Sequence, residues 1–160
     1  MPNDGRYALY TDRLTHSALG GSNPGNMAIF GFTNQNIKSL IPVDKSWNYA
    51  PDLINIKGAK SNGYERKQKA FPLFATSPEI SFTIDATENS PIQNPCFVID
   101  NWNTKNKAIL KINGKAVKES KSFRQGITLD ETGREKLIIW LNIQTSSPVT
   151  VEISGAEPGI

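Results

Sequence analysis

The stretch from Asn94 to Val117, NPCFVIDNWNTKNKAILKINGKAV, decides the fold that we predict for this chain. Within it, Asn113-Gly114 separates two β-prone runs. Such a pair is typical of a type I′ hairpin turn, because both central residues of that turn need a positive φ. Ile112 and Lys115 should therefore face each other. The run 96–99 is apolar at every position and too short for a helix, so we predict a central strand that is covered on both faces.

Alternation of apolar and polar residues predicts further strands on either side of this stretch. Residues 80–86 and 149–153 each place apolar side chains on one face only, whereas residues 137–143 are apolar on both faces through Ile138 and Trp140. We expect the aromatic-rich segment 43–70 to cover that second face. Five or six short strands joined by turns favour an all-β antiparallel sandwich, jelly-roll or Ig-like. Its two layers should close over Phe82, Val98, Leu110, Ile139 and Val151.

The N-terminal part predicts one or two short helices and less regular structure. Residues 12–19 could form one or two helical turns, and residues 6–10 and 27–32 short strands. Ile37, Leu40 and Ile41 have helical spacing after a cap at Thr33 or Asn34, with Pro42 as the stop signal. We expect a strand within 53–56. Clear alternation of apolar and polar residues begins only near Phe71. We therefore predict that residues 1–70 are an extension that packs on a sandwich core of residues 71–160, in one compact domain overall.

The composition is that of an ordinary globular protein. The chain has 160 residues, a net charge of +3 and a single cysteine, Cys96, whose apolar neighbours predict burial. The length suits one domain without disulfides. No run approaches the roughly 20 apolar residues of a membrane span. The polar opening lacks the order of a secretory signal. We expect either a cytoplasmic protein or, the reading we favour, a piece of a longer secreted or periplasmic protein.

No catalytic or cofactor motif stands out in the sequence. His16 is the only histidine, so a two-histidine metal site is excluded, and a local hydrogen bond explains it as simply as catalysis does. The glycines at 20, 21 and 25 lack the order of a phosphate loop. Asp85 and Asp100 end or line strands, where they could be solvated carboxylates or ligands to sugar hydroxyls. We predict no cofactor and no catalytic residue.

A basic run follows the central strand and includes one acid, Glu119. On a hairpin it could form a positive ridge for a nucleic acid or an acidic polysaccharide. Lysines on exposed strands also serve to block edge pairing. Because Phe123 is the only aromatic residue in the run, a nucleic-acid role is disfavoured. The run comprises Lys105, Lys107, Lys111, Lys115, Lys118, Lys121 and Arg124.

Several aromatic residues lie in or beside predicted loops, where two interpretations stay open. They can cover the core, or their flat rings can pack on the apolar C–H faces of sugars while neighbouring polar groups bind the hydroxyls. The residues that we single out for glycan binding are Trp47, Tyr49, Tyr64, Arg66, Asp100, Trp102 and Arg124.

A series of motifs resembles the C-terminal β-rich region of large secreted bacterial proteins that process polysaccharides. The resemblance covers most of residues 40–154, with a preceding piece at residues 11–33. It implies a non-catalytic accessory sandwich of a carbohydrate-active protein, whose partners would be the catalytic domain of the same longer chain and a polysaccharide. The alternatives are an enzyme fragment that contributes Asp12, Arg13 and His16 to an active site, and a free-standing protein or nucleic-acid interaction domain. The motifs are WNYAP (47–51), GYER (63–66), SFTI (81–84), NPCFVIDNW (94–102), INGK (112–115), FRQG (123–126) and LIIWL (137–141).

Overall fold

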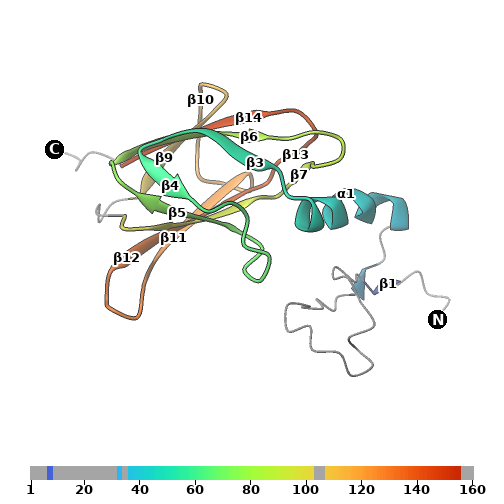
Figure 1. Cartoon of the computed structure of the whole chain (residues 1–160), viewed down its shortest axis with the longest axis horizontal. Helices are drawn as coiled ribbons and strands as arrows, with labels where there is room; N and C mark the ends of the chain where they lie inside the picture. Colours follow the sequence, from blue (N-terminus) through green and yellow to red (C-terminus); the bar gives the residue numbers. More distant parts are fainter. Residues whose placement is uncertain (1–6, 9–31, 34–35, 103–106, 156–160) are drawn as a thin grey trace.

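The computed structural model describes residues 7–8, 32–33, 36–102 and 107–155, and it confirms an all-β sandwich (Figure 1). Two five-stranded sheets pack face to face, and α1 (Ile37–Asn48) lies at one end of them. Neighbouring strands are antiparallel except for the parallel pair β5 and β8. Sheet I has the order β10 (Lys115–Val117), β9 (Ala108–Ile112), β14 (Val149–Gly155), β6 (Glu79–Asp85), β3 (Asp52–Lys57). Sheet II has the order β11 (Phe123–Leu129), β12 (Glu135–Leu141), β8 (Cys96–Asp100), β5 (Phe71–Ala75), β4 (Ala59–Ser61).

Two short pairs of strands complete the described structure. β7 (Ile92–Gln93) pairs with β13 (Gln144–Thr145), and α1 contacts β7. β1 (Tyr7–Ala8), within the predicted strand at 6–10, pairs with β2 (Phe32–Thr33), which shares Phe32 with the predicted strand at 27–32 and includes Thr33, one of the two predicted caps. The other residues of those strands, and the predicted helix at 12–19, lie outside the described part of the chain. Among the described residues, no helix has the length and apolar character that crossing a membrane requires.

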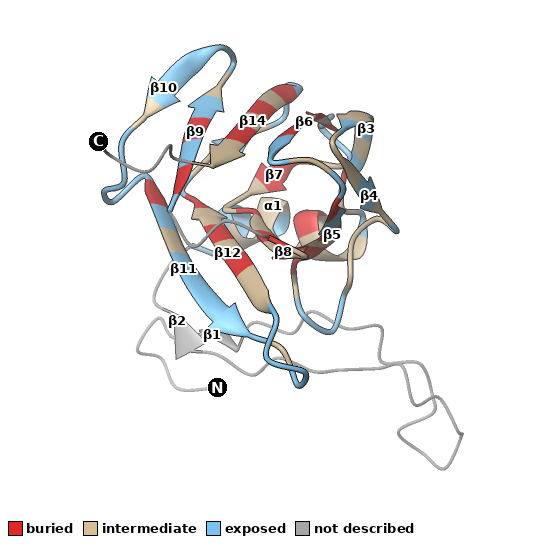
Figure 2. Ribbon diagram, turned by 90° about the vertical axis from the view of Figure 1, so that its left-hand side faces the viewer, coloured by how far each residue is buried: buried red, intermediate tan, exposed pale blue. Residues whose placement is uncertain are grey.

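The core lies between the sheets and is built mainly from alternate side chains of β5, β6, β8, β9, β12 and β14. Figure 2 shows the alternation along β12 and β14 as successive buried and half-buried bands. Phe97 on β8 is at its centre. Its ring centroid lies 5.5 Å from that of Phe71 on the neighbouring strand of sheet II and 5.0 Å from that of Phe82 on sheet I. Aromatic rings at these separations add to the free energy gained from burial. The predicted core residues Phe82, Leu110, Ile139 and Val151 are all buried.

Val98 and Cys96 are the exceptions to the predicted core. The prediction of a strand covered on both faces was wrong: β8 buries Phe97 and Ile99 and turns Cys96 and Val98 outward, where both are half-buried. The physical reason is that β8 belongs to a two-layer structure, so only one face of it meets the opposite sheet. Partial burial still raises the pKa of the Cys96 thiol.

The predicted hairpin is confirmed. Asn113 and Gly114 have φ values of 49° and 75°, and Ile112 pairs with Lys115 in register. The Asn113 side chain also accepts a hydrogen bond from the backbone N–H of Thr150, at 2.9 Å, which ties the turn to β14. The turn therefore fixes the β9–β10 register and holds the end of the hairpin against β14.

Helix α1 differs from its prediction at both ends. Its N-cap is Asn36, whose side chain accepts from the N–H of Lys38, and the helix continues through Pro42 as far as Asn48. Pro42 is the sixth helical residue, so its missing N–H costs one intrahelical bond to Lys38 near the exposed start. Contacts of the later turns outweigh this loss: the ammonium group of Lys45 donates to the Glu88 carbonyl, and Ser46 is buried.

Segment 43–70 extends both sheets instead of covering the outer face of β12. β3, which contains the predicted strand at 53–56, pairs with β6 at the edge of sheet I, and β4 pairs with β5 at the edge of sheet II. Gly58 joins β3 to β4 and so carries the chain from one sheet to the other. The two sheets thus take strands from both sides of residue 70.

Candidate functional site

Four of the seven residues predicted to bind glycan gather where α1 ends, and we call this group the helix-end site: Trp47, Tyr49, Tyr64 and Arg66. Trp47 lies in the last turn of α1 and Tyr49 is its C-cap, while Tyr64 and Arg66 lie between β4 and β5. The Arg66 guanidinium donates to the backbone carbonyl of Asn48 at 2.8 Å. Since that carbonyl belongs to the open end of the helix, the bond both satisfies it and fixes the loop against the helix.

The four side chains differ in exposure. Tyr64 packs edge-on against Phe71, with 5.0 Å between ring centroids, and burial raises the pKa of its phenol, which keeps it a neutral donor. The Lys69 ammonium lies 5.2 Å from the centroid of the Trp47 ring, a cation–π distance. Tyr49 is 56% exposed, and its carbonyl accepts from the Ser90 hydroxyl. Tyr49 therefore presents the open aromatic surface of the site.

A small cavity beneath these residues is lined by Trp47, Tyr64, Lys69 and Asn94 among others. Its free volume of about 30 Å³ is that of a single water-sized group. Asn94 Oδ1 is buried without a hydrogen-bond partner among the described residues. A sugar ring is too large for this cavity. The exposed side chains of the helix-end site are Tyr49 and Arg66, neither of which lines the cavity.

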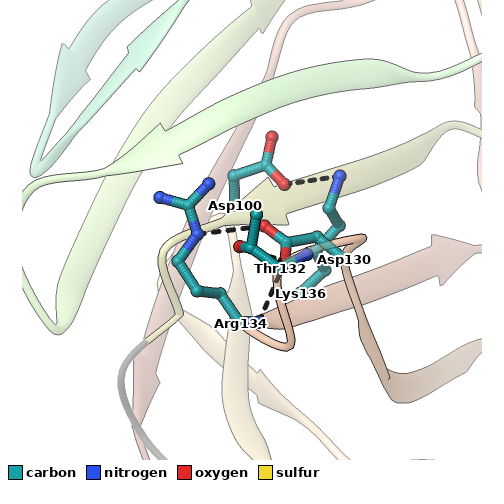
Figure 3. Close-up of polar contacts among 5 residues, drawn as sticks. All are labelled: Asp100, Asp130, Thr132, Arg134 and Lys136. Carbon is teal, nitrogen blue, oxygen red and sulfur yellow. Dashed lines mark hydrogen bonds and ion pairs between the residues drawn. The ribbon is translucent and has the colours of Figure 1, made fainter.

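Arg124 and Asp100 lie elsewhere, on the outer face of sheet II. Arg124 covers the ring of Trp140, its cross-strand neighbour, at 5.4 Å from the centroid. Lys136 places its ammonium group 3.0 Å from Asp100 Oδ1 (Figure 3). Because each group already has a protein partner, a ligand at either position would have to share it.

Trp102 belongs to the core. Its side chain is 1% exposed, so its ring has no free face for a sugar. Asn101, with φ at 58°, turns the chain after β8, and its side-chain amide donates to the Ala75 carbonyl at 2.9 Å. This turn directs Trp102 inward. The polar sequence neighbours of Trp102 resemble those of the exposed Tyr49, so they did not reveal this burial.

The predicted basic ridge is divided between surfaces. Lys107 pairs with Glu119 at 2.9 Å, and the hydrogen bond from Lys107 lowers the pKa of that carboxyl. Lys111 faces Glu152 across sheet I, whereas Arg124 lies on sheet II. Lys115, Lys118 and Lys121 are exposed, and Lys105 lies outside the described residues. The basic side chains therefore do not form one continuous surface.

A groove on the outer face of sheet I was missed by reasoning from the sequence. Its volume is about 330 Å³, within the usual range for ligand pockets. Charges of both signs and two hydroxyls line it, with the half-exposed Ile109 and without an aromatic ring. Only the register of four strands brings these residues together, so no local signal could have revealed it. The polar lining comprises Lys57, Glu79, Ser81, Lys111, Glu152 and Ser154.

The turn between β11 and β12, at the opposite end of the sandwich from α1, is organised by one carboxylate (Figure 3). Asp130 Oδ1 accepts from the Thr132 hydroxyl at 2.7 Å and from the N–H groups of Thr132 and Arg134, and Oδ2 accepts from the Arg134 guanidinium at 3.0 Å. These bonds, the Thr132 hydroxyl foremost, hold the pKa of Asp130 well below its usual range. The carboxylate thus stays ionised and keeps the turn closed.

We predict a pH-dependent contribution of Asp130 to stability. A carboxyl whose pKa is depressed in the folded state binds fewer protons there than in the unfolded chain. The stability it contributes is therefore full above its unfolded pKa, near 4, and is lost as the pH falls towards the folded value. Asp130→Asn should lower the free energy of unfolding at pH 7. Urea titrations from pH 7 to pH 2 should show this difference shrinking below about pH 4, and a difference that is constant with pH would contradict the assignment.

Among the described residues, no group of three or more His, Cys, Asp or Glu side chains is arranged to hold a metal ion. His16, Asp12 and Arg13 lie outside those residues. Comparison of the chain with protein-family models, curated proteins and solved structures gave no match.

Proposed function

We propose that this chain is a non-catalytic binding module of a larger carbohydrate-active protein and that it contacts glycan at the helix-end site. The observation that carries the proposal is the convergence of Trp47, Tyr49, Tyr64 and Arg66, from two segments separate in sequence, at one end of the sandwich. These residues were predicted from their chemistry alone, without regard to position. That they lie together supports a shared role.

The chemistry of the exposed side chains at the helix-end site favours an acidic sugar over a neutral one. Tyr49 offers a flat ring for the C–H face of a pyranose. Arg66 is exposed, and its guanidinium has donors beyond the one bonded to Asn48, in a fork that matches a carboxylate. Lys69 adds a second positive charge beside Trp47. A uronic acid carries both features, an apolar ring face and a carboxylate.

The test is calorimetric titration of the protein with acidic and neutral polysaccharides. We expect binding to an acidic polymer. Tyr49→Ala should weaken it by up to about tenfold, because a stacked ring contributes roughly 0.5–1.5 kcal/mol beyond area burial, whereas Tyr49→Phe should preserve it. Ile109→Ala, at an exposed apolar residue on the outer face of sheet I, is the matched control. Absence of affinity for every polysaccharide, or equal loss in the control, would contradict the proposal.

A second candidate role is packing against another part of a longer protein. It is favoured by the outer face of sheet II, where Val98, Ile138 and Trp140 are half-buried and Phe74 is 47% exposed.

A strongly salt-dependent affinity for polyanions without preference among sugars would instead support the nucleic-acid alternative.

A further inference from the structure

β11 is an unprotected edge of sheet II. It pairs with β12 over seven consecutive residues, from Phe123 opposite Leu141 to Leu129 opposite Glu135, without a shift of register. Figure 2 shows it along the outside of the sandwich, exposed over most of its length. Natural edge strands are usually protected by lysine, proline, a bulge or short length. β11 has none of these, and its one charged residue is Arg124, near its start.

The hydrogen-bond pattern identifies the free backbone groups. The Asn142 N–H donates to the Ser122 carbonyl at 2.9 Å, and the Asp130 N–H donates to the Arg134 carbonyl at 2.8 Å. In an antiparallel ladder every second residue exchanges hydrogen bonds with its partner. Since residues 122 and 130 both bond to the β12 side, the even-numbered residues of β11 bond to β12. The N–H and C=O groups of Gln125, Ile127 and Leu129 must then point away from the sheet. The Gln125 N–H lies against the Glu119 carboxylate. Among the described residues, the C=O of Gln125 and the backbone groups of Ile127 and Leu129 have no recorded partner.

Apolar side chains accompany the free backbone. Ile127 and Leu129 lie on the same face of β11 as the buried Phe123, yet they are 40% and 62% exposed. The end of β11 therefore extends beyond the part of the core that covers Phe123. A strand added alongside β11 would satisfy the backbone groups and cover both side chains at once.

We infer that β11 pairs antiparallel with β11 of a second copy of the chain, with the two-fold axis at Ile127. In this register Ile127 faces Ile127 of the second copy, and Gln125 faces Leu129. The Ile127 pair joins outward-pointing backbone groups and can form both hydrogen bonds of a hydrogen-bonded antiparallel pair. In each Gln125–Leu129 pair the Leu129 N–H can donate to the Gln125 C=O, and the second bond forms if the Gln125 N–H exchanges the Glu119 carboxylate for the Leu129 C=O. The two copies of sheet II would then form one continuous sheet across a closed, isologous interface.

Charge complementarity favours a second copy over an unrelated strand. The same register places Arg124 opposite Asp130 of the second copy, and the symmetry repeats the pair. Asp130 also holds Thr132 and Arg134, and Arg124 covers Trp140, so the new pair adds to these contacts and shares their groups. Arg124 lies on the outer face of sheet II because it alternates with the buried Phe123, and Asp130 follows at the same even-numbered spacing. The carboxylate of Asp130 stays ionised, and opposite charges across an antiparallel pair are stabilising. Thr128 faces Gly126, beside which there is open space.

Sedimentation of the whole chain over a range of concentrations tests the inference. The wild-type protein should show a reversible monomer–dimer equilibrium. Ile127→Lys places like charges opposite each other at the axis and should weaken dimerisation by about tenfold or more. Ile109→Lys, at an equally exposed isoleucine on the outer face of sheet I, should leave it unchanged. A wild-type protein that is monomeric at all concentrations, or an Ile127→Lys variant that dimerises normally, would overturn the inference.

A cross-linking variant keeps the test decisive if Ile127→Lys does not fold. Narrow antiparallel pairs place Cα atoms about 5.5 Å apart, within the range that a disulfide spans. In a Cys96→Ala background, Ile127→Cys should give a covalent dimer on mild oxidation, whereas Ile109→Cys should remain monomeric. Equal cross-linking of the two variants would contradict pairing at β11.

Discussion

Gly58→Ala should destabilise the protein by about 3 kcal/mol or more, or prevent folding altogether. Gly58 has a φ of +70°, and a Cβ atom built on it would lie 1.8 Å from the carbonyl oxygen of Glu79. This neighbour is backbone and cannot rotate away. The Gly58 carbonyl also accepts from the N–H groups of Thr76 and Ser77, at 2.9 and 3.1 Å, so the crossing between the sheets is held from both sides.

Two other glycines separate the causes of this effect. Gly133 has a φ of +80°, but an added Cβ would have nothing within 4 Å, so Gly133→Ala should cost only the backbone strain, about 1–2 kcal/mol. Gly126 has open space and no positive φ, and Gly126→Ala should be nearly neutral. Urea denaturation of the three variants measures the series. If Gly58→Ala were no worse than Gly133→Ala, the close approach of β3–β4 to β6 would be wrong.

The elements that could be predicted from sequence are those whose signal is local. The Asn113-Gly114 turn needs only its own residues, because positive φ at both positions selects them. The alternation along β6, β12 and β14 likewise follows from each strand having one face towards the other sheet. Such patterns establish a sandwich before any strand order is known.

The features that were missed depend on contacts between distant segments. Pro42 is a stop signal in isolation, but contacts of the later turns of α1 keep the helix intact. Val98 and Phe97 are adjacent and equally apolar, yet only the position of sheet I decides which of them is buried. The crossing of the chain at Gly58, between the two sheets, has no local signature beyond the glycine itself.

In the candidate site, too, local sequence signals were informative and contacts between distant segments were not visible. Four of the seven residues selected for glycan binding meet at the helix end, and their role in binding stays a prediction. Sequence could not distinguish Tyr49 from Trp102, because the inward turn at Asn101 arises from a bond to Ala75 in another strand. Lysines near β10 suggested protected edges, whereas β11, the edge strand that follows them, contains no lysine.

The measurement that tests the central claim most directly compares Ile139→Ala with Ile138→Ala. The two residues are identical and adjacent on β12, but Ile139 is fully buried between the sheets and Ile138 faces outward. Loss of a buried isoleucine side chain costs about 2–5 kcal/mol, and the cost falls with exposure. We expect chemical denaturation to show Ile139→Ala in that range and Ile138→Ala at about 1 kcal/mol. Equal losses, or a larger loss at Ile138, would contradict the two-layer sandwich on which the site and the interface depend.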